Sequence, residues 1–568
     1  MDWHFSRHRA DVAFGKRTAT LARMRMQRIS GRVVDVLNRA EFPGTVEFSG
    51  GVIRRIRRDA RPLGPGLIMP GFVDAHIHIE SSMLPPSEFA RLAVVHGTVG
   101  TVSDPHEIAN VLGVPGVAYM VADGRRTPFH FTFGAPPCVP ATDREGSGAR
   151  IGPRAVARLL ARPEIGYLSE VMNFPGVLRG DKALLAMIAS AVRRGKPVDG
   201  HAPGLRGADA AAYAAAGIST DHECFTLAEA KDKIRAGMKI LIREGSAARN
   251  FEALAPLLRS NPDRCMFCCD DLHPDLLVRG HLDLHVRRAL ALGVDRFDAV
   301  ACVTVNPVRH YGLRVGLLQE GDPADFVVVD GWDNFRVRRT YLAGRMAARD
   351  GRSLLPRLRP RIVNRFRARK RRADDFVVKL RPGRLNVIEA VDGQLVTRRR
   401  LMKPKGSRGL AVADPSRDLL KIAVINRYAA RAPAAVGFIR GIGLKTGALA
   451  SSVAHDSHNI VAVGASDAEM TEAVNLVISH GGGVSVVGDG HREVLPLEIA
   501  GLMSAGEGRG VARRYTELDR LAKRLGSRLR APFMTLSFMA LLVIPDLKLS
   551  DRGLFSGSRW KFEPLFER

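Results

Sequence analysis

The sequence has few cysteines and no long apolar run, and each scarcity excludes a class of protein. Six cysteines in 568 residues cannot form a disulfide framework, so we expect a cytoplasmic protein in a reducing compartment. No apolar run approaches the length of about 18 residues that a transmembrane helix requires, so we expect no membrane association. The N-terminal 29 residues are charged throughout and lack the apolar core of a secretory signal. A surface helix is the structure that we expect there.

Three of the cysteines stand close together, at Cys265, Cys268 and Cys269 in the stretch CMFCCDD. A zinc site would need a fourth ligand at matching spacing, and none is evident. We therefore expect these side chains to be core residues of a strand.

Acidic residues are also scarce. The chain has 58 Asp and Glu against 86 Lys and Arg, a net charge of +28. Much of the excess is arginine scattered over the whole chain, and the densest run is RLRPRIVNRFRARKRR at residues 357–372. Such a run could bind a polyanion or form a solvated linker. No aromatic stacking pattern or nucleic-acid motif accompanies it, which favours the linker and makes nucleic acid an unexpected partner.

The chain is too long for one compact core. A length of 568 residues predicts two to four domains. With 46% hydrophobic and 25% charged residues, the composition is that of an ordinary globular protein.

Strand-like and helix-like segments alternate between about residues 70 and 275. The strand-like segments are FVDAHIHI, GTVGTVSD, FHFTFGAPP, GYLSEVMN, KPVDGHA, GISTDH, KILIREGS and CMFCCDD. Amphipathic stretches such as ALLAMIASAVRRG lie between them. Eight repeats of this alternation predict an α/β fold whose parallel sheet closes into a (β/α)8 barrel.

Polar residues cluster at the ends of these predicted strands. Alternation along the first strand places Phe72, Asp74, His76 and His78 on one face, which we expect to be the barrel interior. In the later strands the polar residues come last, at Asp104, Glu170, His201, His222, Asp270 and Asp271. The C-terminal ends of the strands form the active face of a (β/α)8 barrel, so these groups should meet at one rim.

The converging side chains have the chemistry of metal ligands. An isolated buried histidine is more often a core residue than a ligand, but four histidines and a glutamate that meet at one rim favour a metal site. Imidazole and carboxylate together suit zinc, manganese or iron. A glutamate between two histidine pairs could bridge two metals, and a bridging water would then be acidic enough to attack at neutral pH. An aspartate after the eighth strand could carry the proton from that water to a leaving group.

Longer stretches resemble a known family. A strand that ends His-x-His, a carboxylate on the fourth strand, histidines on the fifth and sixth and an aspartate on the eighth resemble the amidohydrolase superfamily. The stretches PGFVDAHIHIESSMLPP, HGTVGTVSDPHEIANVLG, REGSAARN and DDLHPDLLVRGHLD resemble the adenine deaminase family. So do GIGLKTGALASSVAHDSHNIVAVG, LPLEIAGLMS and PFMTLSFMALLVIPDLKL in the C-terminal part. The resemblance runs from about residue 30 to 550.

The resemblance implies hydrolytic deamination of adenine to hypoxanthine and ammonia, a reaction of purine salvage and adenine catabolism. A metal-bound hydroxide would attack C6 of adenine, and a carboxylate would shuttle the proton to the leaving ammonia. A binuclear site is implied, with Mn²⁺ favoured and Fe²⁺ or Zn²⁺ as alternatives. The partner would be a small-molecule purine, and we expect a homodimer.

The resemblance also assigns residues. The metals would be held by His76, His78, His201, His222, Asp270 and the bridging Glu170. Asp270 would be the catalytic carboxylate together with Glu170, although the sequence leaves Asp271 open as an alternative. Further metal or substrate contacts could come from Asp104, His106 and Glu107 in the stretch DPHE. The alternative for that stretch is an N-terminal helix cap, with Asp104 before Pro105.

Segments on both sides of the barrel complete the predicted domain organisation. Residues 1–69 hold an N-terminal segment and the first part of a β-sandwich, and residues 70–312 form the catalytic barrel. Residues 313–374 return to the sandwich and contain the basic linker, and residues 375–568 form a C-terminal α+β domain of the adenine deaminase type. This last domain carries AHDSHN, in which His455 and His458 could contact metal or substrate. We favour a role in closing the site over substrate, because the barrel already supplies enough ligands.

The chain departs from the family pattern at a few positions. Val99 and Gly100 stand in a stretch where the family usually has GTTTV, Cys269 stands where threonine is usual, and the tail GLFSGSRWKFEPLFER differs. None of these changes removes a predicted ligand, but they leave open another 6-aminopurine or an N6-substituted adenine as substrate.

Two further alternatives belong to other classes. The charge of +28 allows a non-enzymatic polyanion-binding protein on the same scaffold. Hydrolysis of a cyclic amide is disfavoured, because such enzymes commonly bridge their metals with a carboxylated lysine, and GYLSEVMN contains Glu170 and no lysine.

Overall fold

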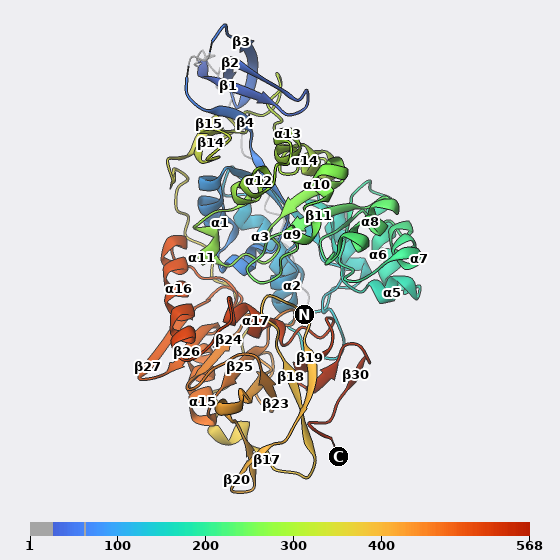
Figure 1. Cartoon of the computed structure of the whole chain (residues 1–568), viewed down its shortest axis with the longest axis vertical. Helices are drawn as coiled ribbons and strands as arrows, with labels where there is room; N and C mark the ends of the chain where they lie inside the picture. Colours follow the sequence, from blue (N-terminus) through green and yellow to red (C-terminus); the bar gives the residue numbers. More distant parts are fainter. Residues whose placement is uncertain (1–25, 62–63, 568) are drawn as a thin grey trace, which may run out of the picture.

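The computed structural model describes residues 26–61 and 64–567 (Figure 1). The predicted surface helix at the N-terminus falls almost wholly on residues 1–25 and so lies outside the described residues. A small sheet from the N-terminal part lies at one end of the molecule, the parallel strands lie in the middle, and the C-terminal region lies at the other end (Figure 1).

Eight short parallel strands form the central part. Five of them make one sheet in sequence order: β5 (Phe72–Ile77), β6 (Thr98–Ser103), β7 (His130–Ala135), β8 (Ile165–Val171) and β9 (Val198–Gly200). The second sheet contains β10 (Thr220–Asp221), β11 (Lys239–Arg243) and β12 (Cys265–Cys268). Backbone hydrogen bonds join the sheets at both edges, from Ser219 N to Val198 O (2.9 Å) and from His78 N to Asp270 O (3.1 Å). The arrangement is TIM-barrel-like, and each strand overlaps a predicted segment.

Helices surround these strands. They are α1 (Pro86–Ala93), α2 (His106–Leu112), α3 (Val114–Gly124), α4 (Pro153–Leu160), α5 (Phe174–Leu178), α6 (Lys182–Val192), α7 (Gly207–Ala215), α8 (Leu227–Arg235), α9 (Phe251–Leu254), α10 (Leu257–Ser260), α11 (Pro274–Leu277), α12 (Leu282–Ala291), α13 (Arg296–Ala301) and α14 (Val305–Tyr311). Local sequence explains several of their limits. The carboxylate of Asp181 accepts hydrogen bonds from the first N–H groups of α6, and proline stands in the first turn of α4, where its missing N–H costs nothing.

The first barrel strand does not alternate regularly, which corrects one prediction. The pairing of β5 with β6 shifts register between Asp74 and Ile77. Ala75 packs in one small cluster with Val102 of the neighbouring β6 and with Tyr167 of β8 and Leu241 of β11, so it faces the barrel interior. Asp74 instead contacts His281, at the start of α12, with 3.0 Å between Oδ2 and Nε2. The predicted shared face of Asp74 and His76 was therefore wrong, because a bulge interrupts the two-residue period.

The two segments that flank the barrel pair with each other, as expected. They form one eight-stranded sheet in the order β16–β15–β14–β13–β4–β1–β2–β3. The strands are β1 (Gln27–Asp35), β2 (Ala40–Ser49), β3 (Val52–Arg58), β4 (Leu67–Pro70), β13 (Phe326–Val329), β14 (Val337–Leu342), β15 (Arg345–Arg349) and β16 (Arg352–Ser353). The antiparallel pair β4–β13 joins the two segments. Closure of this sheet into a sandwich stays a prediction.

The C-terminal region is built around a nine-stranded sheet. It contains β18 (Arg384–Glu389), β19 (Arg398–Met402), β22 (Leu420–Ile425), β23 (Ala434–Arg440), β24 (Ala448–Ser451), β25 (Ile460–Gly464), β26 (Gly483–Gly488), β27 (His491–Pro496) and β31 (Phe566–Glu567). Two three-stranded sheets accompany it, β17 (Val378–Lys379) with β20 (Lys405–Ser407) and β21 (Leu410–Val412), and β28 (Leu547–Ser550) with β29 (Gly553–Ser556) and β30 (Lys561–Phe562). The helices are α15 (Asp467–Ser479), α16 (Gly508–Arg524) and α17 (Pro532–Phe538). Ser466 caps α15 by accepting a hydrogen bond from Glu469 N.

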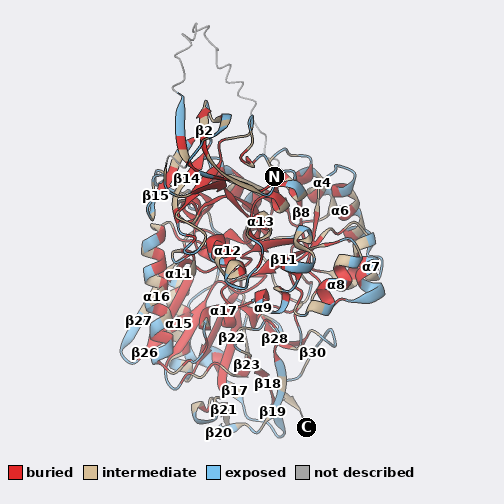
Figure 2. Cartoon of the chain, turned by 45° about the horizontal axis from the view of Figure 1, so that its top comes forward, coloured by how far each residue is buried: buried red, intermediate tan, exposed pale blue. Residues whose placement is uncertain are grey.

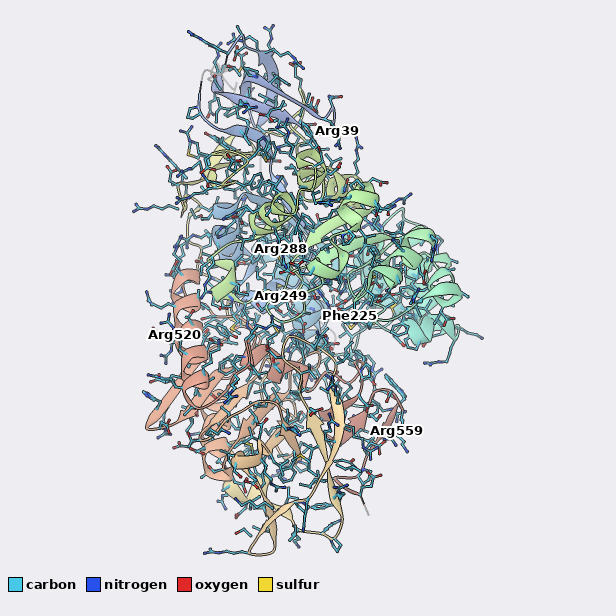
Figure 3. All side chains as sticks on the ribbon, viewed as in Figure 1. Arg39, Phe225, Arg249, Arg288, Arg520 and Arg559 are labelled. Carbon is cyan, nitrogen blue, oxygen red and sulfur yellow. The ribbon has the colours of Figure 1, made fainter. Side chains whose placement is uncertain are left out.

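Burial agrees with the interpretations of cysteine and charge. All six cysteines are buried and free, as expected of core residues. The buried positions continue from the barrel into the C-terminal sheet (Figure 2). The arginines labelled in Figure 3 lie at widely separated places, with Arg39 near the N-terminal sheet, Arg520 on α16 and Arg559 in the C-terminal region. Residues 354–372 form no helix or strand and are mostly exposed, although Arg371 N donates to Asn475 of α15 (2.8 Å). Among the described residues, no helix is long and apolar enough to cross a membrane.

Candidate metal and catalytic site

The polar residues predicted at the strand ends meet in one place. Glu170 closes β8, and His201, His222 and Asp270 directly or closely follow β9, β10 and β12. These four residues and His78 line a common cavity. All six residues predicted as ligands are buried, including His76 at the end of β5. The six predicted ligands all lie at or just after the C-terminal ends of their strands, as the fold requires.

Glu170 lies between histidines on opposite sides. Its Oε1 is 3.5 Å from Nε2 of His78, and its Oε2 is 2.7 Å from Nδ1 of His201. The same Oε2 is 3.2 Å from Nε2 of His222. Burial alone would raise the pKa of Glu170, but the two histidines beside Oε2 lower it well below its ordinary value. A carboxylate with both oxygens facing imidazoles has the geometry needed to bridge two cations.

His76, His78 and Asp270 form a second contact group. The Nε2 atoms of the two histidines face each other at 3.3 Å. Asp270 Oδ1 lies 3.5 Å from the first and 3.1 Å from the second. The ring of His222 stacks on His76, with 4.2 Å between centroids, which connects this group to the Glu170 group.

The donor set fits divalent cations. The sets His76–His78–Asp270 and His76–Glu170–His222 each bring their ligand atoms within 4.8 Å of one another. Within the described residues, His201 Nε2 is buried without a hydrogen-bond partner. Buried polar atoms of this kind are normally satisfied, and imidazole with carboxylate is the ligand combination of Zn, Mn and Fe sites. The cluster is therefore suited to hold divalent metal.

The DPHE stretch lies against the same cluster. His106 Nδ1 is 3.2 Å from Asp104 Oδ2 and 3.4 Å from Glu170 Oε1, and together with His78 these residues form another possible ligand group. Asp104 also acts at the start of α2, because its Oδ1 accepts the N–H of His106 at 3.0 Å. Pro105 rather than Asp104 is the N-cap residue of α2, and no side chain caps this helix, so the cap expected at Asp104 is wrong, while a metal or substrate contact by Asp104 stays a prediction.

The C-terminal region reaches the site through AHDSHN. Glu107 on α2 contacts both histidines of this motif: it forms an ion pair with His455, whose Nδ1 lies 2.5 Å from Oε1, and a hydrogen bond between Oε2 and Nε2 of His458. Burial lowers the pKa of His455, but Glu107 and Asp271 outweigh it and raise the pKa to about 9. His455 and Asp456 line the cavity with the barrel residues. One carboxylate therefore fastens the C-terminal loop over the rim of the barrel.

The paired aspartates after β12 have different environments. Asp270 Oδ1 faces the histidines, and its Oδ2 accepts from Arg243 Nη1 at 2.6 Å. Burial opposes ionisation of Asp270, but Arg243 and the histidines hold its pKa well below the usual range. Asp271 Oδ1 instead accepts from Ser81 Oγ at 2.5 Å, and burial raises the pKa of this carboxyl. The geometry thus favours Asp270 as the aspartate within the histidine cluster.

Two charged residues beside the predicted ligands were missed by sequence reasoning. Glu223 follows His222 directly and lies 3.6 Å from its Nε2. Arg243 is 1% exposed and binds both Glu223 and Asp270 through Nη1. Both residues stand at predicted strand ends, Glu223 after His222 in DHE and Arg243 in REGS. That the arginine on β11 meets carboxylates after β10 and β12 follows only from how these strands are aligned in the sheet.

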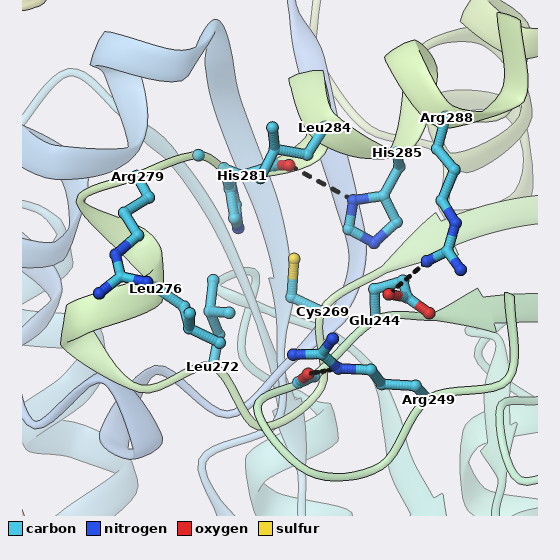
Figure 4. Close-up of a pocket in the computed structure, with 12 residues that line it drawn as sticks. Glu244, Arg249, Cys269, Leu272, Leu276, Arg279, His281, Leu284, His285 and Arg288 are labelled. Carbon is cyan, nitrogen blue, oxygen red and sulfur yellow. Dashed lines mark hydrogen bonds and ion pairs between the residues drawn. The ribbon is translucent and has the colours of Figure 1, made fainter. Parts of the chain in front are cut away.

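A second cavity of about 320 Å³ shares no lining residue with the histidine cavity (Figure 4). Cys269 lines it, together with Leu272, Leu276 and Arg249. The Cys269 thiol points into this second cavity in Figure 4, so the cysteine that replaces the family's usual threonine does not line the cavity of Asp270. Val99 and Gly100 lie on β6 and are likewise not among the described residues that line the histidine cavity.

Comparisons with known proteins agree with this geometry. Residues 67–347 match the family model described as "Amidohydrolase family", and residues 394–561 match "Adenine deaminase C-terminal domain". "Adenine deaminase" of Salinibacter ruber is 58% identical over 539 residues, covering 95% of this chain and 98% of the relative. The protein of the same name from Sulfurovum sp. is 54% identical, covering 93% and 98%. "Adenine deaminase" of Methanosarcina mazei is 49% identical, covering 95% and 100%.

A solved structure of β-aspartyl dipeptidase from Fervidobacterium islandicum aligns over 59% of this chain and 99% of its own, with 14% identity and a TM-score of 0.45. That similarity is too weak to support an argument. The three adenine deaminases named above are much stronger matches than this structure, because their sequence identity extends over nearly the full length of both chains. On that ground, the chain is a member of the adenine deaminase family, with an amidohydrolase barrel and the C-terminal domain of that family.

Proposed function

We propose that this enzyme hydrolyses adenine to hypoxanthine and ammonia. The observation that carries the proposal is the cluster in which Glu170 lies between four histidines and Asp270, in a chain that belongs to the adenine deaminase family. The same cluster argues against a non-enzymatic role, because a scaffold that only binds polyanions has no use for six buried ligand-type side chains.

The cluster would hold two divalent cations. His76, His78 and Asp270 would hold one, His201 and His222 the other, and Glu170 would bridge them. Mn²⁺ is the metal that we favour, with Fe²⁺ and Zn²⁺ as alternatives. When bound, such cations lower the pKa of a water molecule so that it can attack at neutral pH.

The chain's own carboxylates would move the protons. Asp270 is held ionised by Arg243, so it can accept a proton from the attacking water. C6 of adenine becomes tetrahedral in the reaction, and the same carboxyl can then deliver the proton to the amino nitrogen, which leaves as ammonia. If one carboxyl takes the proton from the water oxygen and gives it to the amino nitrogen, it must face the reacting centre. Asp270 Oδ1 does face the histidine cluster.

The DPHE and AHDSHN residues would bind and enclose the substrate. Asp104, His106 and Glu107 lie on the barrel side and His455 and His458 on the C-terminal side, and Glu107 connects the two. Because the barrel supplies the bridging set by itself, we assign these five residues to substrate contact and site closure. We further propose the division into residues 1–69, 70–312, 313–374 and 375–568, and a cytoplasmic homodimer.

One assay tests the proposed function. Manganese-loaded protein is incubated with a panel of 6-aminopurines that includes adenine and N6-methyladenine, and release of ammonia or methylamine is followed. We expect adenine to have the highest kcat/KM. Turnover of another 6-aminopurine without turnover of adenine would replace the substrate, and no turnover of any base would overturn the proposed function.

A further inference from the structure

The cavity above Glu170 is too small in this structure for a purine. Its volume is about 30 Å³, room for a water molecule or two, whereas pockets for small ligands usually exceed about 300 Å³. Leu395, Phe538 and Leu541 form the apolar part of its wall, with Met172 from the barrel. We call these first three side chains the apolar roof. A purine can occupy the site only if the apolar roof lies farther from the carboxylates than it does here.

The apolar roof comes from the C-terminal region alone. Leu395 lies on the loop between β18 and β19, Phe538 ends α17, and Leu541 follows three residues later. The Phe538 ring packs beside His455, with 5.1 Å between centroids. The floor of the cavity thus carries the reacting groups, while the roof carries apolar surface of the kind that packs on the face of an aromatic base.

One buried lysine connects the two segments of the apolar roof. Nζ of Lys548, on β28, donates to the carbonyl of Leu395 at 2.6 Å and to that of Phe538 at 2.9 Å. Lys548 is 0% exposed and makes no ion pair within residues 26–61 and 64–567. Thr397 Oγ1 also donates to the carbonyl of Leu547 at 2.8 Å, so the Leu395 loop is fastened to β28 at two points.

We propose that Lys548 is a positioning residue for the substrate site: by binding the carbonyls of Leu395 and Phe538, it holds the two segments of the apolar roof together as one surface on which the purine ring packs. The inference rests on the proposed function, which supplies the purine. It predicts that the roof discriminates between adenine and bulkier N6-substituted bases.

A lysine at this position is costly for stability, which supports a role. Burial lowers the pKa of Lys548 to about 7, because a charge without a carboxylate partner is disfavoured in an apolar interior. A methionine would fill similar space without that cost. What methionine cannot do is donate hydrogen bonds to two carbonyls of separate segments, and either the ammonium or the neutral amine can.

The test compares steady-state kinetics of Lys548→Met with those of the unmodified, manganese-loaded enzyme. We expect KM for adenine to rise about tenfold, a loss of roughly 1.4 kcal/mol in binding, with kcat within about twofold and metal content unchanged. The preference for adenine over N6-methyladenine should fall in parallel. Lys548→Gln, which keeps an N–H donor, should restore part of the KM. Lys523→Met is the matched control, because Lys523 is exposed and pairs with Asp519 at 2.6 Å, and it should leave KM unchanged.

Unchanged KM and unchanged preference in folded Lys548→Met would overturn the proposal, as would a loss of kcat and metal content with no change in KM. If that variant does not fold, Leu395→Ala tests the same roof: we expect a weakened preference for adenine, and an unaltered preference would refute it. Turnover by the unmodified enzyme tests the proposed function separately. If the unmodified enzyme acts on another 6-aminopurine, the variants are compared on that base. A failure of the proposed substrate is therefore distinguishable from a failure of the proposed role of Lys548.

Discussion

At the scale of single residues, Asp270 and Asp271 offer the sharpest comparison. Asp270→Asn keeps the size of the side chain and removes its capacity to accept a proton. We expect turnover to fall at least about 10³-fold, within the range for losing a general acid–base, while metal content measured by plasma emission spectrometry stays the same. Asp271→Asn is the matched variant, and its loss should be much smaller. Full activity of Asp270→Asn would contradict the assignment.

Arg243 should matter for stability as well as for catalysis. Its guanidinium neutralises the buried carboxylates of Glu223 and Asp270. Arg243→Met removes the guanidinium partner of both carboxylates, so we expect the free energy of unfolding to fall by about 3–5 kcal/mol, measured by urea denaturation. Arg249→Met is a suitable control because Arg249 is exposed and should cost little. Equal losses in the two variants would show that the ion pairs do not stabilise the fold.

The site residues that could be predicted were those whose positions relative to a predicted strand are visible in the sequence. His76, His78, Glu170, His201 and His222 each come at or just after a recognisable strand end, so their convergence follows from the fold. Arg243 was not predictable in the same way, because an arginine within KILIREGS reads as a polar residue at the end of a strand. Only the neighbouring strands reveal that two carboxylates face it.

At the scale of elements, strand existence was easier to predict than strand regularity. All eight barrel strands coincide with predicted segments, yet β10 contains only Thr220 and Asp221, and β5 contains a bulge. A bulge depends on pairing with the neighbouring strand, which no period within FVDAHIHI reveals. The two histidines still reach the site, because His76 lies within the irregular stretch and His78 lies just after it.

Helix α14 provides a pH-dependent prediction. Burial lowers the pKa of His310 to about 4, whereas an unfolded histidine has a pKa of about 6.5. The unfolded chain therefore binds more protons than the folded chain between these values, so stability falls as pH drops from 6.5 to 4. His310→Gln removes this contribution. Urea denaturation of both proteins should show that the difference between them changes by up to about 3 kcal/mol over that range, and a constant difference would rule out the shifted pKa.

At the scale of the whole molecule, bound metal should stabilise the folded chain. Removal of divalent cations by a chelator leaves a buried cluster of carboxylates and imidazoles without its counter-charge. We expect the midpoint of thermal unfolding to fall, and to recover on addition of Mn²⁺, since a ligand at about 1,000 times its Kd stabilises the folded state by roughly 4 kcal/mol. A midpoint that is indifferent to chelator and metal would contradict the metal assignment.

The pattern of strand-like segments and turns along the chain predicted which segments pair. It did not predict which residues cover the site. Alternating strands and glycine-rich turns identified the flanking sheet and the C-terminal sheet. The apolar roof was not predictable, since Leu395, Phe538 and Leu541 read as ordinary core residues. Their role depends on where the C-terminal region docks on the barrel, a long-range arrangement that local sequence does not encode.

The order of the parts along the chain has a consequence for synthesis. Every proposed metal ligand lies at or before Asp270, whereas the last residue of the apolar roof, Leu541, comes roughly 270 residues later. At about 5–20 residues per second, a ribosome needs on the order of half a minute to cover that distance. All the residues that would hold metal are thus made before the residues that cover the site, which would give metal ions an interval in which to bind before the site is covered.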